Sequence, residues 1–459
     1  MRRRATAVAL VALVAVLAEA APAMAAPRFE RIAGFKSPGT PAKYNKVGVL
    51  QFGSKSARNV LILNPGTSAS AAYFAPLART ITSKAKNWQV WAVERRENLL
   101  EDHSVLNRLK SGKVKGKKLF DYYLNFTTDS SIKDHFQFIP NDTVGFASEW
   151  GMKTEIGDLR RVVQLAQKRH ARKIVVGGHS LGGSITTAYA TWDFGGKPGA
   201  KGLAGLVYID GGSSPTPVTA DQASQSLTDL RKGTPWLAFG GFPAPFSGLF
   251  NVVGGGLVEV EPNVLSRLSD WPGLPAIIKP PVPATSLGGY GYALDTETSD
   301  ASLAAAQAHL GHLAASGDPR GWDRAGELTP IKRYADMFTG WGLKGLDGTA
   351  WYHPRRLTID SGAVADGNAN DAQSVLDVRA THGSDLPRKL RIYAFGAALG
   401  GQRVLDAAHA LAAQSKIPAD RVTLVDRHDT YAHNDPNSAA PKNDFVAKLF
   451  PFLAKVARD

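Results

Sequence analysis

The sequence predicts an α/β fold, in which a mostly parallel β-sheet has helices on both faces and a large inserted domain interrupts it. Short strand-like apolar runs alternate with helical patterns in the first half of the chain and again near its C-terminus. Between these parts the chain becomes rich in Pro, Gly, Trp and Phe, and the alternation stops. With 44% hydrophobic and 20% charged residues, the chain has a globular composition.

The expected elements follow one another in a regular order. Strands are predicted at 47–51, 60–63, 89–93, 174–176 and 206–209, with helices at 71–84 and 154–169. The later part adds strands at 390–395 and 421–425, with helices at 402–415 and 444–456. The irregular part contains two isolated helical patches, at 301–314 and 330–338. We therefore expect a sheet domain formed by 26–213 and 386–459, with an inserted cap or lid at 214–385.

The N-terminus has the pattern of an export signal. Three arginines precede an apolar run, and small residues then lead to Ala23-Met24-Ala25, an A-x-A cleavage pattern. We expect residues 1–25 to be a signal peptide and the mature protein to be secreted or held in the periplasm or cell envelope. The apolar run is too short to cross a bilayer and no later run is longer, so we expect no transmembrane segment.

The chain is strongly basic, with a formal net charge of +14. Such a charge favours anionic partners such as cell-envelope polymers. The densest basic cluster comprises Lys110, Lys113, Lys115, Lys117 and Lys118. We interpret it as a solvated loop, because no nucleic-acid motif accompanies it, and we expect no specific nucleic-acid binding.

The most specific motif is Gly178-His179-Ser180-Leu181-Gly182, a G-x-S-x-G sequence placed directly between a predicted strand and a predicted helix. Small residues two before and two after the serine allow a tight strand-to-helix turn that exposes its hydroxyl. The helix that follows directs its N-terminal amides toward the serine oxygen. This context predicts that Ser180 is a nucleophile.

On these residues the chain resembles the α/β-hydrolase fold family, and the resemblance covers both sheet segments but no motif of the insertion. It implies the chain order nucleophile, acid, histidine. It also implies an oxyanion loop after an earlier strand, where this chain has Asn64-Pro65-Gly66-Thr67-Ser68 in place of the usual His-Gly. By position, the N–H groups of Thr67 and Leu181 would be the oxyanion donors.

The family places its histidine after the last strand, where His428 and His433 both qualify. We favour His433, because it lies several residues into the loop and its His-Asn-Asp-Pro sequence resembles a form found in some members. Asp435 would then orient the loop.

The acid is less clearly indicated, because the turn after strand 390–395 contains no carboxylate. Pancreatic-lipase-like members carry the acid one strand earlier, where this chain has Asp210. An Asp there would hold the imidazole tautomer. Asp406 and residues of the insertion remain alternatives.

These features predict an exported serine hydrolase, esterase- or lipase-like, that cleaves carboxylic esters of small-molecule or lipid substrates through Ser180, His433 and Asp210. No cofactor and no metal are expected: His309 and His312 lie three residues apart in a predicted helix but lack a third ligand. The alternatives are an acyltransferase or amidase of the same fold, and a non-catalytic basic cell-surface binding protein, which the carboxylate-free turn favours.

Overall fold

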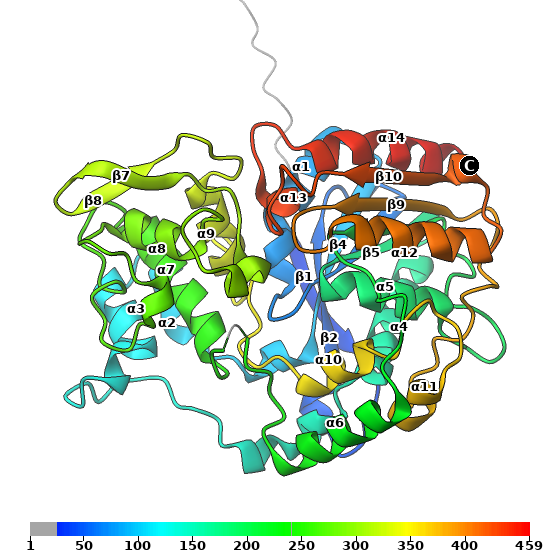
Figure 1. Ribbon diagram of the computed structural model, residues 1–459, viewed down its shortest axis with the longest axis horizontal. Coiled ribbons are helices and arrows are strands. Elements are labelled where there is room, and N and C mark those ends of the chain that lie inside the picture. The colour runs from blue at the N-terminus through cyan, green and yellow to red at the C-terminus, as the bar shows by residue number, and fades with distance from the viewer. Residues whose placement is uncertain (1–24, 240) are drawn as a thin grey trace, which may run out of the picture.

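The computed structural model describes residues 25–239 and 241–459 (Figure 1). The expected signal peptide therefore lies outside the described residues, apart from Ala25. Among the residues described, no helix combines the length and the apolar character needed to cross a membrane.

The core of the structure is an eight-stranded sheet with the order β1-β2-β4-β3-β5-β6-β9-β10. Strand β2 is antiparallel to both neighbours, and every pairing from β4 to β10 is parallel. This confirms the predicted mostly parallel sheet. The strands are β1 (Arg28–Ala33), β2 (Lys46–Phe52), β3 (Asn59–Asn64), β4 (Trp88–Glu94), β5 (Lys173–His179), β6 (Gly205–Ile209), β9 (Arg391–Gly396) and β10 (Val422–Asp426).

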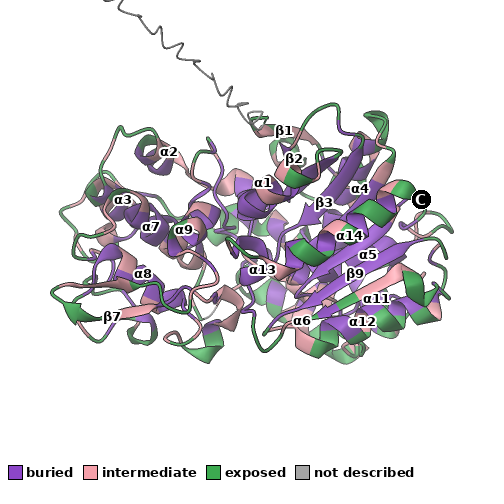
Figure 2. Cartoon of the chain, turned by 90° about the horizontal axis from the view of Figure 1, so that it is seen from above, coloured by how far each residue is buried: buried purple, intermediate pink, exposed green. Residues whose placement is uncertain are grey.

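Helices cover both faces of this sheet because the parallel strands are apolar on both sides. One face packs against α1 (Ala75–Lys84) and α14 (Asp444–Arg458). The other packs against α4 (Met152–Lys168), α5 (Leu181–Thr191) and α12 (Gly401–Gln414). Figure 2 shows the buried strands between these helices.

A second lobe lies beside the sheet and forms the left half of Figure 1. It combines helices from two separate parts of the chain, one after β4 and one between β6 and β9. Its elements are α2 (Ser104–Lys110), α3 (Gly116–Tyr123), α7 (Phe246–Val260), α8 (Ser286–Leu294), the hairpin β7 (His312–Gly317) and β8 (Arg320–Asp323), and α9 (Ile331–Thr339).

Helix α7 is the centre of this lobe because three consecutive glycines let other helices approach it closely. A Cβ on Gly254 would lie 2.5 Å from the ring of Tyr290, and one on Gly256 would lie 2.6 Å from Leu119. These contacts join α7 to α8 and to α3. The core of the lobe is continuous with the core on the α1 face of the sheet.

Not all of the segment 214–385 belongs to this lobe. Helices α6 (Ala220–Lys232), α10 (Arg355–Ser361) and α11 (Asp371–Leu376) pack beside α4 and α5 on the sheet domain (Figure 1). The predicted boundaries of the cap remain a prediction, but the lobe itself includes residues 104–123 and excludes the two ends of the insertion.

The predicted helix at 301–314 is wrong. Residues Ala301–Ala306 form a 3-10 helix, after which the chain turns into β7. Gly311 has φ 112°, a value outside the helical range. The backbone N–H of His309 donates to Asp435 and that of Leu310 donates to Asp295, so side chains replace the helical acceptors. His309 and His312 therefore do not share a helix.

Candidate active site

Ser180 lies in a sharp turn between β5, in the middle of the sheet, and α5. Its φ of 55° is in the left-handed region, which side chains rarely adopt. A Cβ on Gly178 would collide with the carbonyl group of Gly182, and one on Gly182 would collide with the carbonyl oxygen of Asn64. The turn therefore requires both glycines, and it presents Ser180 at the N-terminus of α5.

The structure brings Asp210 and His433 together. Asp210 follows β6 and His433 lies in the loop after β10, yet Asp210 Oδ2 is 2.6 Å from His433 Nδ1. Each residue is only 2% exposed, so water does not compete for this contact. A carboxylate that accepts the Nδ1 proton leaves Nε2 as the basic nitrogen of a neutral imidazole.

The turn after β9, which has no carboxylate of its own, donates backbone hydrogen bonds to Asp210. Oδ1 accepts the N–H groups of Ala397 at 2.7 Å, Gly400 at 2.9 Å and Gly401 at 3.3 Å, and Oδ2 accepts that of Leu399 at 3.3 Å. Burial alone would raise the pKa of the Asp210 carboxyl. The contact with His433 and these N–H groups outweigh burial, so the pKa lies below its ordinary value and the carboxylate stays ionised.

Ser180 and His433 line the same cavity, which has a volume of about 210 Å³. Within the described part of the chain, no hydrogen bond joins these two side chains. Gly66 and Thr67 of the loop after β3 line this cavity too. A Cβ on Gly66 would lie 2.8 Å from Ser180 Cβ, so the loop lies directly against the turn that carries Ser180.

In the described part of the chain, neither of the two predicted oxyanion donors is used in a hydrogen bond within the protein. Among the described hydrogen bonds, the N–H groups of Thr67 and Leu181 have no acceptor in the protein. Leu181 is the first residue of α5, where a helical N–H lacks an internal partner. Both groups are therefore available to an oxygen atom bound beside Ser180.

Comparisons with solved structures found proteins that are similar to this chain over most of its length. A candidate lipase from Sulfolobus solfataricus is 13% identical over 94% of this chain and 93% of its own, with a TM-score of 0.48. A thermophilic esterase from Thermogutta terrifontis is 11% identical over 94% and 99%, with a TM-score of 0.37. No family model and no curated protein matches the sequence.

These values are too low to carry an argument about substrate or mechanism. The strand order and the strand-elbow-helix turn around Ser180 decide the fold. The chain has the α/β-hydrolase fold. This confirms the resemblance found in the sequence.

Within the α/β-hydrolase fold, a buried arginine holds the predicted oxyanion loop. Arg95, at the end of β4, donates to the carbonyl oxygens of Pro65 at 2.9 Å, Gly66 at 3.0 Å and Ala69 at 2.9 Å. The N–H of Ser68 faces Nδ1 of His353 at 3.3 Å. Arg95 therefore determines where the Thr67 N–H points, which the local sequence could not indicate.

The loop that carries His433 is held from both lobes. Asp435, which is fully buried, accepts the N–H of Ala432 at 2.8 Å and the hydroxyl of Thr329 at 2.8 Å, and contacts His309 Nδ1 at 2.6 Å. Asp435 thus orients the loop, as expected from the sequence.

His179, the neighbour of Ser180, contacts the same loop from the sheet side. Its Nε2 lies 2.9 Å from the carbonyl oxygen of His433. Burial, together with the nearby His433, lowers the pKa of His179 to about 3. His179 therefore stays neutral, and an Nε2–H donated to that carbonyl satisfies both groups.

The alternative candidates lie away from the cavity. His428 is exposed and pairs with Asp426 at 2.7 Å and with Asp429 at 3.1 Å. Asp406 is exposed on α12 and accepts a hydrogen bond from Gln402. Neither residue lines the cavity that contains Ser180.

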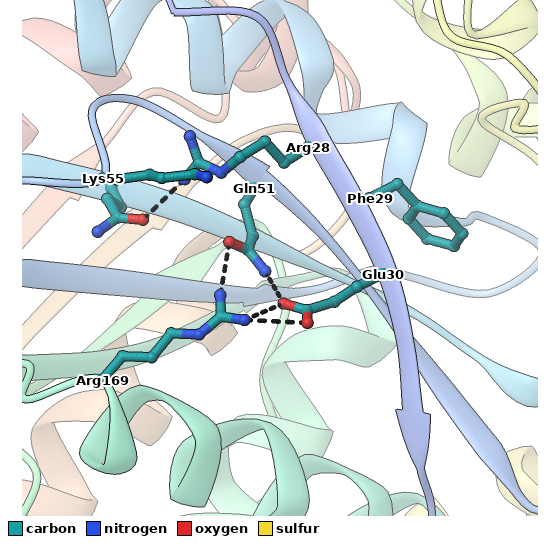
Figure 3. Close-up of a pocket in the computed structure, with 7 residues that line it drawn as sticks. Arg28, Phe29, Glu30, Gln51, Lys55 and Arg169 are labelled. Carbon is teal, nitrogen blue, oxygen red and sulfur yellow. Dashed lines mark hydrogen bonds and ion pairs between the residues drawn. The ribbon is translucent and has the colours of Figure 1, made fainter.

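The polar hollow at the edge of the sheet does not resemble an active site. A hollow of about 500 Å³ at the β1–β2 edge contains Arg28, Glu30, Gln51 and Arg169, which are bonded to one another or to neighbouring polar groups (Figure 3). It contains no hydroxyl or imidazole group.

The basic cluster at 110–118 is not one exposed patch. The Lys110 ammonium group is bonded to the carbonyl oxygens of Leu343 and Leu346 inside the second lobe. Lys117 pairs with Asp121, and Lys118 pairs with Asp134. Lys113 and Lys115 are exposed, as expected for a solvated loop.

Proposed function

We propose that this α/β-hydrolase-fold protein is a serine hydrolase that cleaves carboxylic esters. Ser180 attacks the ester carbonyl while His433 takes its proton, and His433 then protonates the leaving alcohol. Water, activated by the same imidazole, hydrolyses the acyl-enzyme. Asp210 holds His433 in the required tautomer, and the N–H groups of Leu181 and Thr67 stabilise the oxyanion.

The observation that carries this proposal is the buried contact of 2.6 Å between Asp210 and His433 beside the Ser180 elbow. It also weakens the case for a non-catalytic binding protein. That alternative depended on the carboxylate-free turn after β9, and the N–H groups of this turn bind a carboxylate supplied by the neighbouring strand.

The surroundings of the cavity favour esters of hydrophobic acids. The cavity at Ser180 shares four lining residues with a second, smaller cavity in the second lobe: Phe239, Ser247, Asn251 and Ala306. The remaining walls of that second cavity are mainly apolar, and they come from Phe242, Phe250, Ile278, Ala293, Leu294 and Leu303. This second cavity has a volume of only about 40 Å³, so a short acyl group that extended from Ser180 toward it would bury apolar surface.

Covalent labelling tests the proposal. A fluorophosphonate probe is expected to modify Ser180 in the wild-type protein, and peptide mass spectrometry locates the adduct. Ser184→Ala is the matched control, because Ser184 lies one turn further along α5 and donates to the Gly212 carbonyl. Labelling that survives Ser180→Ala, or no labelling of a folded wild-type protein, would contradict the assignment.

We also propose export, with residues 1–25 as the signal and the net positive charge favouring association with anionic envelope polymers. N-terminal sequencing of the protein recovered from the culture medium or the cell envelope tests this. A mature chain that begins near Ala26 is expected. Protein that retains Met1 and stays in the cytoplasm would contradict export.

A further inference from the structure

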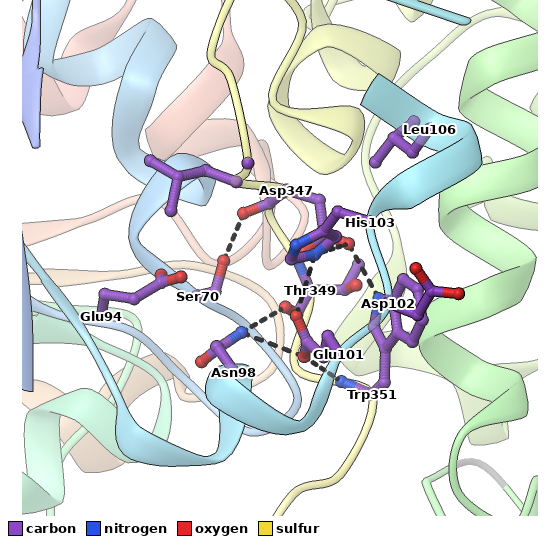
Figure 4. A network of polar contacts seen from close by, with 12 residues as sticks. Ser70, Glu94, Asn98, Glu101, Asp102, His103, Leu106, Asp347, Thr349 and Trp351 are labelled. Carbon is purple, nitrogen blue, oxygen red and sulfur yellow. Dashed lines mark hydrogen bonds and ion pairs between the residues drawn. The ribbon is translucent and has the colours of Figure 1, made fainter. Parts of the chain in front are cut away.

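A second cluster of chemically active side chains lies outside the Ser180 cavity. Glu101 and His103 follow β4, and Asp347 lies in the segment after α9. The side chains of Glu101 and Asp347 have no exposed surface, and that of His103 is 10% exposed. One ligand-type atom from each residue lies within 4.8 Å of the others (Figure 4). Nothing in the proposed hydrolytic mechanism uses these groups.

Two of the three spacings between these atoms are close to those of metal ligands. His103 Nε2 lies 3.1 Å from Glu101 Oε2 and 3.4 Å from Asp347 Oδ2. Zinc binds nitrogen and oxygen ligands at about 2.0–2.2 Å in a tetrahedron, which places neighbouring ligand atoms about 3.3–3.6 Å apart. As metal ligands, the two carboxylates would be ionised and the imidazole neutral, so the three groups would carry two negative charges, which one divalent cation balances in a buried site.

Within the described ranges of the chain, the hydrogen-bond geometry leaves two atoms of this cluster without a partner. His103 Nε2 and Glu101 Oε2 are both buried and, among the described residues, have no hydrogen-bond partner, so the short approach between them lacks donor geometry. Two neighbouring residues also have a buried oxygen with no partner in the described part of the chain: Oδ1 of Asn98 and Oγ1 of Thr349. A buried polar atom without a partner is costly, and a cation would satisfy the two atoms of the cluster itself.

Hydrogen-bond donors around the cluster orient its two carboxylates, as the groups that surround the ligands of a metal site do. Glu101 Oε1 accepts the Asn98 side-chain amide at 3.1 Å and the Trp351 N–H at 2.8 Å, which leaves Oε2 facing His103. Asp347 Oδ1 accepts the N–H of Thr349 at 3.0 Å, and Oδ2 accepts the Trp351 indole N–H at 2.8 Å. Such outer contacts fix ligand orientation and typically affect metal affinity by about 10- to 100-fold.

We propose that Glu101, His103 and Asp347 form a binding site for a divalent transition-metal ion, with zinc as the best fit. Mixed imidazole and carboxylate ligands suit zinc, whereas calcium requires six to eight oxygen atoms. With three protein ligands, a water molecule completes the tetrahedron.

The site would join parts of the chain that are far apart in sequence. The Asp347 carbonyl accepts the Ser70 hydroxyl, and the Ala350 N–H donates to the Ser68 carbonyl at 2.9 Å. The metal would therefore fix the segment after β4 to the segment that holds the predicted oxyanion loop. Its role in this position is structural, and it does not depend on the proposed hydrolysis.

Metal content and thermal stability test the proposal on the full mature chain. The wild-type protein is first stripped of metal with a chelator, dialysed, and then incubated with zinc. It is expected to bind one zinc per chain, measured by inductively coupled plasma mass spectrometry. Its thermal midpoint is expected to rise with zinc concentration but not with calcium or magnesium. Glu101→Gln and Asp347→Asn are each expected to weaken zinc binding at least tenfold, and Trp351→Phe by about 10- to 100-fold.

His428→Gln is the matched control, because His428 also lies between two carboxylates but is exposed and hydrogen-bonded to Asp426. This variant is expected to bind zinc as the wild type does. If the wild-type protein binds no zinc and its midpoint does not change with added metal, the cluster is an ion triad around a protonated His103 and the proposal fails. This result does not depend on whether any variant folds.

Discussion

The contacts of Asp210 make Asp210→Asn a sharp test of the proposed relay. The asparagine carbonyl oxygen can take the place of Oδ1 and accept the N–H groups of Ala397, Gly400 and Gly401. The amide NH2 group must then face His433. The opposite orientation would direct the NH2 group at those three N–H donors, and each unsatisfied donor costs about 1–3 kcal/mol.

An NH2 group facing Nδ1 requires that nitrogen to act as an acceptor, so the imidazole proton moves to Nε2. The nitrogen that faces the cavity then cannot remove a proton from Ser180. A wrong tautomer of this kind lowers turnover by roughly 10⁴-fold in a serine hydrolase. The fold should lose little stability, about 1–2 kcal/mol, because neutral hydrogen bonds replace charge-assisted ones.

The assay is turnover of a p-nitrophenyl ester, measured with urea unfolding of the same preparation. Asp406→Asn is the control, because Asp406 is an exposed carboxylate on α12, close in the chain to the same turn. It should leave both quantities unchanged. Turnover of Asp210→Asn within tenfold of the wild type would refute the reasoning and place the acid elsewhere.

Three further predictions use the same assays. Ser180→Ala and His433→Ala should each lower turnover by roughly 10⁶-fold without loss of the fold, whereas an inactive His428→Ala with a near-normal His433→Ala would reverse the assignment of the base. Gly66→Ala should lower turnover by roughly 10²-fold, because its Cβ would lie 2.8 Å from Ser180 Cβ and shift the loop; unchanged turnover would mean that the loop makes no oxyanion contact. Because the pKa of His179 is about 3 in the folded protein, below its ordinary 6.5, the unfolded chain takes up a proton first as pH falls. At pH values below 6.5, this residue should lower the free energy of unfolding by up to about 1.4 kcal/mol per pH unit. Urea unfolding of His179→Gln should show a shallower pH dependence, and a slope equal to that of the wild type would contradict the lowered pKa.

Features that depend on residues close together in the sequence could be predicted from it. Seven strands of the main sheet (β2 to β6, β9 and β10) and the turn around Ser180 lie where apolar runs and the glycine spacing place them. Strand β1 lacks an apolar run and was not predicted. The patch at 301–314 has helix-forming alanines, but Asp435 and Asp295 from distant segments bind its backbone, and no local pattern contains this information.

The parts of the candidate site that depend on distant residues could be predicted only in part. Asp210 was one of several candidate acids, since the N–H groups that bind it belong to a turn far along the chain. Arg95 holds the loop of Thr67 from another strand. Glu101 and His103 gain Asp347 as a neighbour only through folding, so the sequence showed no three-ligand spacing.

The two-part construction of the second lobe affects how the protein acquires its structure. Helices α2 and α3 are synthesised long before α7, which covers them. Until α7 arrives, the apolar side chains of Leu109 and Leu119 are without the partners that bury them. Contacts between such distant segments slow folding and expose surfaces that aggregate. Any transfer of this lobe to another protein with the α/β-hydrolase fold would therefore require both stretches of chain, because neither has a complete apolar core by itself.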